Sequence, residues 1–85
     1  MTEPTPELRQ QVEASYSQLE PTRVFQGCKV AEDERGTVVR VYSQPRQRPR
    51  VLPPPYRVFR FDSATGTLNP LTDEEAAPYR IKNYK

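Results

Sequence analysis

Histidine is absent from this sequence, and cysteine occurs only once, as Cys28. Without histidine, the chain has no imidazole acid–base group, no Ser-His or Cys-His nucleophile pair and no histidine-containing zinc site. A single thiol excludes both an internal disulfide and a four-thiolate metal site, and Cys28 is interpreted as a small buried apolar residue. We therefore expect a protein that is not an enzyme and that uses neither a cofactor nor a metal.

Long apolar runs are also missing, since apolar residues make up 34% of the 85 residues and the mean hydropathy is −0.90. No stretch is long enough to cross a membrane, and the N-terminus lacks the basic and apolar pattern of a secretory signal. We expect a cytoplasmic protein that makes no membrane contact. The apolar residues recur in alternating runs, which predicts one small domain over residues 1–85 with a flexible N-terminus at residues 1–5.

Acidic residues are absent between Arg35 and Arg60, a stretch that carries seven arginines. Residues 1–34 hold seven acids against three bases, and residues 61–85 hold four against three. The formal net charge of +2 therefore conceals a strongly basic centre between two acidic ends. Such asymmetry bears on the charge of partners and not on the fold.

A helix is predicted between Thr5 and Pro21. Thr5 is a favourable N-cap, the proline that follows it suits the first helical position, and Pro21 ends the helix. Four apolar residues recur at steps of four, four and three, which places them on one face that we expect to cover a sheet. These residues are Leu8, Val12, Tyr16 and Leu19.

The periodicity changes to two after Arg23, which predicts a strand at residues 24–30 and a second at residues 37–42. Gly27 marks a possible bulge in the first strand, and residues 31–36 form the hairpin loop between the two. Glu32–Glu34 is interpreted as part of this loop and not as a metal site, because three adjacent carboxylates rarely converge on one ion. Alternation in the first strand is expected to place one set of residues on one face, Val24, Cys28 and Val30, and the other set on the opposite face, Phe25 and Lys29. In the second strand, the two sets are Thr37, Val39 and Val41 on one face and Val38, Arg40 and Tyr42 on the other.

Residues 56–61 show the strongest strand pattern in the chain. A turn from Asp62 to Gly66 follows, because aspartate bonds nearby backbone N–H groups and glycine tolerates positive φ. Residues 67–71 form the return strand, shortened by Pro70. The sequence thus predicts an α+β fold, in which an N-terminal helix packs on an antiparallel meander of three to five strands.

The C-terminal part begins with a capping box at Thr72–Glu75, and Pro78 limits the helix to about one turn. Asp73–Glu75 is interpreted as the acidic start of this helix. Residues 79–85 alternate apolar and polar side chains, which is typical either of a last strand, with Tyr79 and Ile81 facing inward, or of an ordered tail.

A long loop rich in proline and arginine covers residues 43–55, between the second and third strands. Loops of this length are commonly functional, and its prolines favour an extended polyproline II form that loses little entropy on binding. The alternative is a solvated connection whose arginines serve solubility.

Arginine and tyrosine together are typical of contacts with an acidic protein surface, where guanidinium groups pair with carboxylates and tyrosines act as anchors. We therefore expect a binding or adaptor protein. The alternative ligand is single-stranded nucleic acid, which the same residues would bind through phosphate contacts and base stacking. The sequence leaves the oligomeric state open. The candidate partner-binding residues are Arg40, Tyr42, Arg46, Arg48, Arg50, Tyr56, Arg57 and Arg60.

Overall fold

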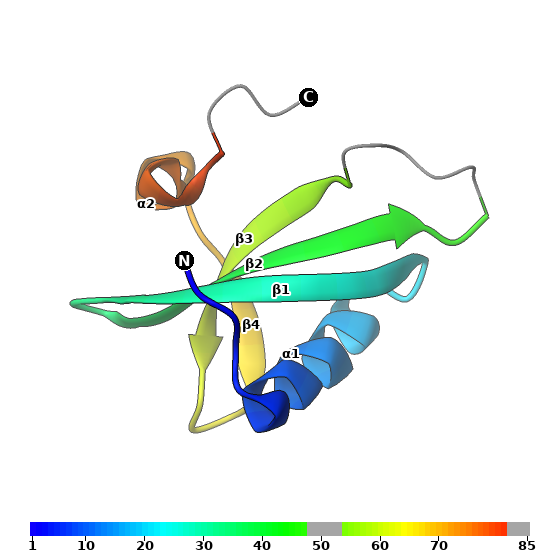
Figure 1. Ribbon diagram of the computed structural model, residues 1–85, viewed down its shortest axis with the longest axis horizontal. Helices are drawn as coiled ribbons and strands as arrows, with labels where there is room; N and C mark the ends of the chain where they lie inside the picture. The colour runs from blue at the N-terminus through cyan, green and yellow to red at the C-terminus, as the bar shows by residue number, and fades with distance from the viewer. Residues whose placement is uncertain (48–53, 82–85) are drawn as a thin grey trace.

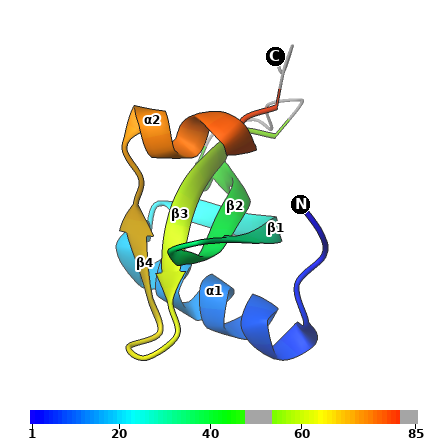
Figure 2. The ribbon, with the colours of Figure 1, turned by 90° about the vertical axis from the view of Figure 1, so that its left-hand side faces the viewer.

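The computed structural model describes residues 1–47 and 54–81. One helix, α1 (Pro6–Leu19), lies on one side of a four-stranded antiparallel sheet, and a short C-terminal helix lies on the other (Figures 1 and 2). The strands follow the chain in the order β1-β2-β3-β4, as a meander. The predicted α+β fold is confirmed. The strands are β1 (Arg23–Asp33), β2 (Gly36–Pro45), β3 (Tyr56–Asp62) and β4 (Thr67–Pro70).

Helix α1 begins where the sequence predicts. The Leu8 N–H donates to Thr5 Oγ1 at 3.2 Å, so Thr5 is the N-cap. Val12 and Tyr16 have no exposed surface and Leu8 packs against the same apolar core. The prediction for Leu19 is wrong, because this side chain is 44% exposed in the last turn, where the helix extends past the core.

The predicted bulge in β1 is confirmed, and it reverses the faces of the residues before it. The register between β1 and β2 shifts between Phe25 and Gly27. One extra residue in a strand exchanges inward and outward positions. Phe25 therefore packs on the core, whereas Val24 is 41% exposed, and the predicted grouping of Val24 with Cys28 is wrong.

The β1–β2 hairpin is tighter than predicted. Strand β1 continues to Asp33 and β2 begins at Gly36, so the turn itself contains only residues 34 and 35. Gly36 has a φ of +124°, which favours glycine. The predicted loop over residues 31–36 is therefore mostly strand, and this places Asp33 at the end of the sheet.

Alternation along β2 and β3 is regular and creates two different faces. Val39, Val41, Phe59 and Phe61 face α1 and form the core with Leu68 of β4. The predicted faces of β2 are thus confirmed. The predicted turn after β3 is also confirmed: Gly66 N–H donates to the Asp62 carbonyl at 2.7 Å, and Gly66 has a φ of +68°.

The C-terminal part starts with the predicted capping box on Thr72, followed by α2 (Asp73–Ala76) and a 3-10 turn, η1 (Ala77–Tyr79). Of the two alternatives for residues 79–85, the strand does not form at residues 79–81. Pro78 occupies the start of the 3-10 turn, and the Arg80 N–H closes that turn on the Ala77 carbonyl at 3.3 Å. The remainder of that prediction, residues 82–85, lies outside the described residues.

The loop between β2 and β3 lies where the sequence predicts it, but it starts later, because β2 continues to Pro45. Ser43 and Gln44, predicted as loop, are buried strand residues. At the other end of the chain, Thr2 pairs with Val30 on the outer edge of β1 through two backbone hydrogen bonds of 2.8 Å. None of the helices in the described part of the chain is both long enough and apolar enough to span a membrane.

Candidate binding surface

The sheet face that turns away from α1 carries four of the six candidate residues that the structure describes. Arg40 and Tyr42 of β2 are on this second face, as are their neighbours Tyr56 and Arg60 of β3. Arg57 is on the opposite face, because residues three apart in a strand point to opposite sides. Arg46 follows the end of β2, and Arg48 and Arg50 lie outside the described residues.

Arg40 is half-buried and contacts the C-terminal segment. Its Nε donates to the Tyr79 carbonyl at 3.0 Å and its Nη2 donates to the same oxygen. Nη1 donates to the Tyr42 hydroxyl at 3.2 Å, and the guanidinium lies 5.5 Å from the centre of the Tyr56 ring. No carboxylate of the described residues lies within ion-pair distance of Arg40, so its charge is balanced only by dipoles and a ring face.

The two tyrosines on this face are neighbours across β2 and β3. The ring centres of Tyr42 and Tyr56 are 6.1 Å apart, at an interplanar angle of 54°. The Tyr56 hydroxyl accepts a hydrogen bond of 3.0 Å from the Ile81 N–H. Tyr56 therefore contacts the C-terminal segment directly, and Tyr42 contacts Tyr56 and Arg40.

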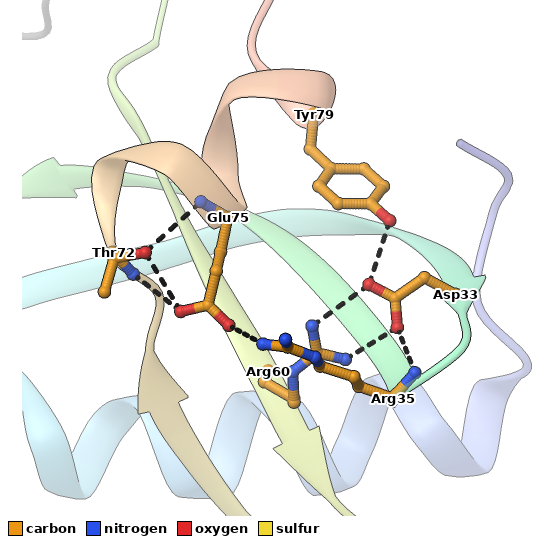
Figure 3. A network of polar contacts seen from close by, with 6 residues as sticks. All are labelled: Asp33, Arg35, Arg60, Thr72, Glu75 and Tyr79. Carbon is orange, nitrogen blue, oxygen red and sulfur yellow. Dashed lines mark hydrogen bonds and ion pairs between the residues drawn. The ribbon is translucent and has the colours of Figure 1, made fainter.

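Asp33 joins three separate parts of the chain at the end of the β1–β2 hairpin (Figure 3). Arg60 donates to both of its carboxylate oxygens, at 2.8 and 3.0 Å, which is the bidentate form of this ion pair. The Tyr79 hydroxyl donates at 3.2 Å and the Arg35 backbone N–H at 2.8 Å. The hydrogen bonds from Arg60 and from the Arg35 backbone hold the pKa of Asp33 well below its usual range.

Asp33 was missed by the sequence analysis, which treated it as a loop residue. Its partner Arg60 is 27 positions away and belongs to a strand on the far side of β2. Nothing in the local sequence indicates such a pairing. One signal could have placed Asp33 on the same face as Arg40: the two-residue alternation of β1, if it is continued to the last residue of that strand.

A second set of contacts holds α2 to the hairpin. Arg35 pairs with Glu75 at 2.9 Å, while Glu75 also accepts from the backbone and hydroxyl of Thr72 in the capping box (Figure 3). The hydrogen bond from the Thr72 backbone is the main cause of the lowered pKa of Glu75. The hairpin tip therefore fixes both ends of the short C-terminal helical region.

At the opposite end of the sheet, two further arginines lack acidic partners among the described residues. Arg23 Nε donates to Ser43 Oγ at 2.8 Å, and Arg46 Nε donates to the Pro21 carbonyl at 3.3 Å. Within residues 1–47 and 54–81, neither guanidinium has a carboxylate at ion-pair distance. We call this region the basic end; it encloses an open pocket of about 370 Å³ lined by Pro21, Thr22, Arg23, Pro45, Arg46 and Gln47.

Most other arginines have acidic partners. Arg57 pairs with Glu20 and lies 5.2 Å from the centre of the Phe59 ring, on the helix-covered face. Arg60 has Asp33 as described, and Arg80 pairs with Asp73 at 2.9 Å. Thus Arg57 and Arg60, both candidate partner-binding residues, are engaged within the chain itself.

Chemically reactive groups are scarce in the described part of the chain. Cys28 is 4% exposed, and burial raises its pKa to about 11, so its thiol stays protonated and unreactive at neutral pH. Over residues 1–47 and 54–81, no three acidic, cysteine or histidine side chains converge to form a possible metal site. Comparisons with models of known protein families, with curated proteins and with solved structures found no match to this chain.

Proposed function

We propose that this chain is a non-enzymatic binding or adaptor protein that contacts an acidic protein partner through its basic end and the adjoining loop. The observation that carries the proposal is the contrast among the arginines. Arg57, Arg60 and Arg80 face carboxylates of the chain, whereas Arg23 and Arg46 have only neutral acceptors among the described residues. Arg40 also lacks a carboxylate partner there, but the C-terminal segment occupies its guanidinium. Uncompensated charge next to a pocket favours a ligand that supplies carboxylates.

The local structure supports this proposal in two further ways. Arg46 is held at the end of β2 by its backbone bond to Thr22 at 3.0 Å, so its position is fixed relative to the sheet. The sequence then continues with Arg48 and Arg50, which lie outside the described residues but add to the same basic segment. Two prolines, Pro21 and Pro45, form an apolar part of the pocket beside these charges.

Nucleic acid is the other ligand of matching charge, and the described structure favours it less. Base stacking needs open ring faces. The Tyr56 ring is covered by Arg40, and the ring of Phe59 is fully buried. Nucleic-acid binding is therefore an outcome that the test has to distinguish.

The test is an affinity capture from cell lysate with and without nuclease, read by mass spectrometry. The wild-type chain is compared with two variants. The first is Arg46/Arg48/Arg50→Ala. The control, Arg9/Lys29/Arg80→Ala, also loses three positive charges, but from residues that are paired with carboxylates of the chain. The proposal expects a nuclease-resistant partner that is lost only in the first variant. Equal capture by both variants would contradict it.

A direct titration complements the capture. A ten-residue glutamate peptide and a ten-nucleotide single-stranded DNA are each titrated against the wild-type chain at several salt concentrations. For the nucleic acid, the logarithm of affinity falls linearly with the logarithm of salt, with a slope of about −0.7 per phosphate contact. Tighter binding of the DNA than of the peptide, lost in the Arg46/Arg48/Arg50→Ala variant, would assign the basic end to nucleic acid instead.

A further inference from the structure

We propose that the second sheet face contains a binding site for an extended peptide, and that the chain's own residues 79–81 occupy this site in the structure. The site consists of Arg40, Tyr56 and Asp33. It goes beyond the contact proposed at the basic end, with which it shares no residue. The C-terminal segment is then an internal ligand that blocks the site until it is displaced.

The contacts are those by which proteins bind the main chain of a peptide. Arg40 donates twice to the Tyr79 carbonyl, and the Tyr56 hydroxyl accepts from the Ile81 N–H at 3.0 Å. In an extended chain, the C=O of one residue and the N–H of the second residue after it point to the same side. Arg80, between them, is extended with φ −83° and ψ 146°. The site therefore holds two main-chain groups at the spacing of an extended peptide.

One side chain of the segment is also bound. The Tyr79 hydroxyl donates to Asp33 Oδ2 at 3.2 Å, and Arg60 donates to both oxygens of that carboxylate (Figure 3). Asp33 is thus oriented before the tyrosine arrives, which lowers the cost of binding. The chemistry of the site specifies a tyrosine, then any residue in an extended conformation, and then a residue with a free N–H.

The segment is held in a way that permits exchange. Among residues 73–81, Ala76 is the one buried side chain, so little apolar surface fixes the segment to the sheet. Tyr79 and Ile81 are only partly buried. The described hydrogen bonds and ion pairs of the segment are polar, and the Arg35–Glu75 pair is formed by an arginine side chain that is 72% exposed. Regions with few buried apolar contacts open at low free-energy cost. A partner peptide that carries the same groups competes for the site when the segment opens.

The proposal is tested with the full-length chain and a labelled peptide, acetyl-Ala-Pro-Tyr-Arg-Ile-amide, which copies residues 77–81. In the variant Glu75→Gln/Ile81→Pro the internal segment is weakened, because one change removes the charge paired with Arg35 and the other removes the N–H that Tyr56 accepts. Arg40, Tyr56 and Asp33 are unchanged. Fluorescence anisotropy should show binding at least about tenfold tighter to the variant than to the wild type, because a larger fraction of the site is open.

A matched peptide provides the control without altering the protein. Methylation of the isoleucine nitrogen removes the one N–H that Tyr56 accepts, and this peptide should lose most of its affinity. Adding Tyr56→Phe to the variant should lower the affinity for the plain peptide but not the affinity for the methylated peptide. The two peptides should then bind with equal affinity. Absence of binding to the opened variant, or equal binding of both peptides to it, would overturn the proposal.

If the variant does not fold by circular dichroism, the wild-type chain gives the same answer. NMR of the Ile81 backbone N–H, which loses its bond to Tyr56 when the segment is displaced, should show a shift at high concentrations of the plain peptide and not of the methylated one. No shift with either peptide would overturn the proposal.

Discussion

The two faces of the sheet are stabilised by different interactions. The face towards α1 is closed by apolar packing: Phe59 and Tyr16 have no exposed surface and meet edge to face, with ring centres 6.0 Å apart. The other face buries Val38, but most of its described contacts are polar, such as Arg40 with the Tyr79 carbonyl and Asp33 with Arg60. Apolar burial holds a structure together without direction, whereas charged contacts require specific partners and are partly exchangeable with solvent. The first face therefore determines stability, and the second is suited to binding.

The largest expected effect comes from Phe59→Ala. Removal of a fully buried ring costs about 3 to 5 kcal/mol, a large part of the total stability of a domain of this size. The matched change on the second face of the same strand, Tyr56→Ala, should cost clearly less, because that side chain is only partly buried. Urea unfolding followed by circular dichroism measures both. A larger loss for Tyr56→Ala than for Phe59→Ala would reverse the comparison.

A smaller loss is expected from Tyr16→Phe. The Tyr16 hydroxyl and Ser43 Oγ are 2.7 Å apart and buried in the core, and Arg23 also donates to Ser43. Loss of one buried hydrogen bond costs about 1 to 2 kcal/mol. Tyr42→Phe removes a hydroxyl from the second face and serves as the control, with a smaller loss in the urea midpoint. Equal losses would show that the two faces do not differ in burial.

The pH dependence of stability tests the polar face. Because the pKa of Asp33 is lowered from its ordinary value of 3.8, the unfolded chain binds more protons than the folded chain below that value. The contribution of Asp33 is therefore complete above about pH 5 and is lost progressively as the pH falls further. Glu75, whose pKa is also lowered, acts in the same direction.

In the variant Asp33→Asn, stability should fall less steeply at acidic pH than in the wild type. The urea midpoint, measured from pH 7 to pH 2, reports this dependence. The variant should be less stable than the wild type at pH 7 and approach it at the acid end. Glu7→Gln is the control, because Glu7 is an exposed first-turn residue with no part in these contacts. A curve for Asp33→Asn that runs parallel to the wild-type curve would show that Asp33 does not control acid stability.

The smallest effect is expected from Leu19→Ala. This side chain is 44% exposed, and surface substitutions usually change the free energy of unfolding by less than about 0.5 kcal/mol. Leu68→Ala removes the same side chain from a site with 6% exposure and should cost about 2 to 5 kcal/mol. Thermal unfolding of the pair distinguishes them. A loss at Leu19 comparable to that at Leu68 would mean that α1 packs along its full length.

Features that depend on neighbouring residues were predictable. The caps at Thr5 and Thr72, the turn from Asp62 to Gly66 and the alternation of β2 all follow from local backbone chemistry, and the structure confirms them. The faces of β1 were harder to predict. The bulge at Gly27 was expected, but its effect on Val24 and Phe25 depends on the register with β2.

The candidate residues show the same division. Sequence alternation placed Arg40 beside Tyr42 correctly, because both belong to one strand. It gave no indication that Asp33 pairs with Arg60, or that residues 79–81 cover Arg40 and Tyr56, since these contacts join segments more than 20 positions apart.

The amino-acid sequence by itself determined the helix, the strands, the turns and the basic centre of this protein, because each follows from local conformational preference, periodicity or composition. The tertiary structure alone decided which arginines are neutralised and which are not. Whether a guanidinium meets a carboxylate depends on distances across the sheet, and these are set by strand register and by the packing of the C-terminal segment. The basic end and the covered peptide site are therefore properties of the fold.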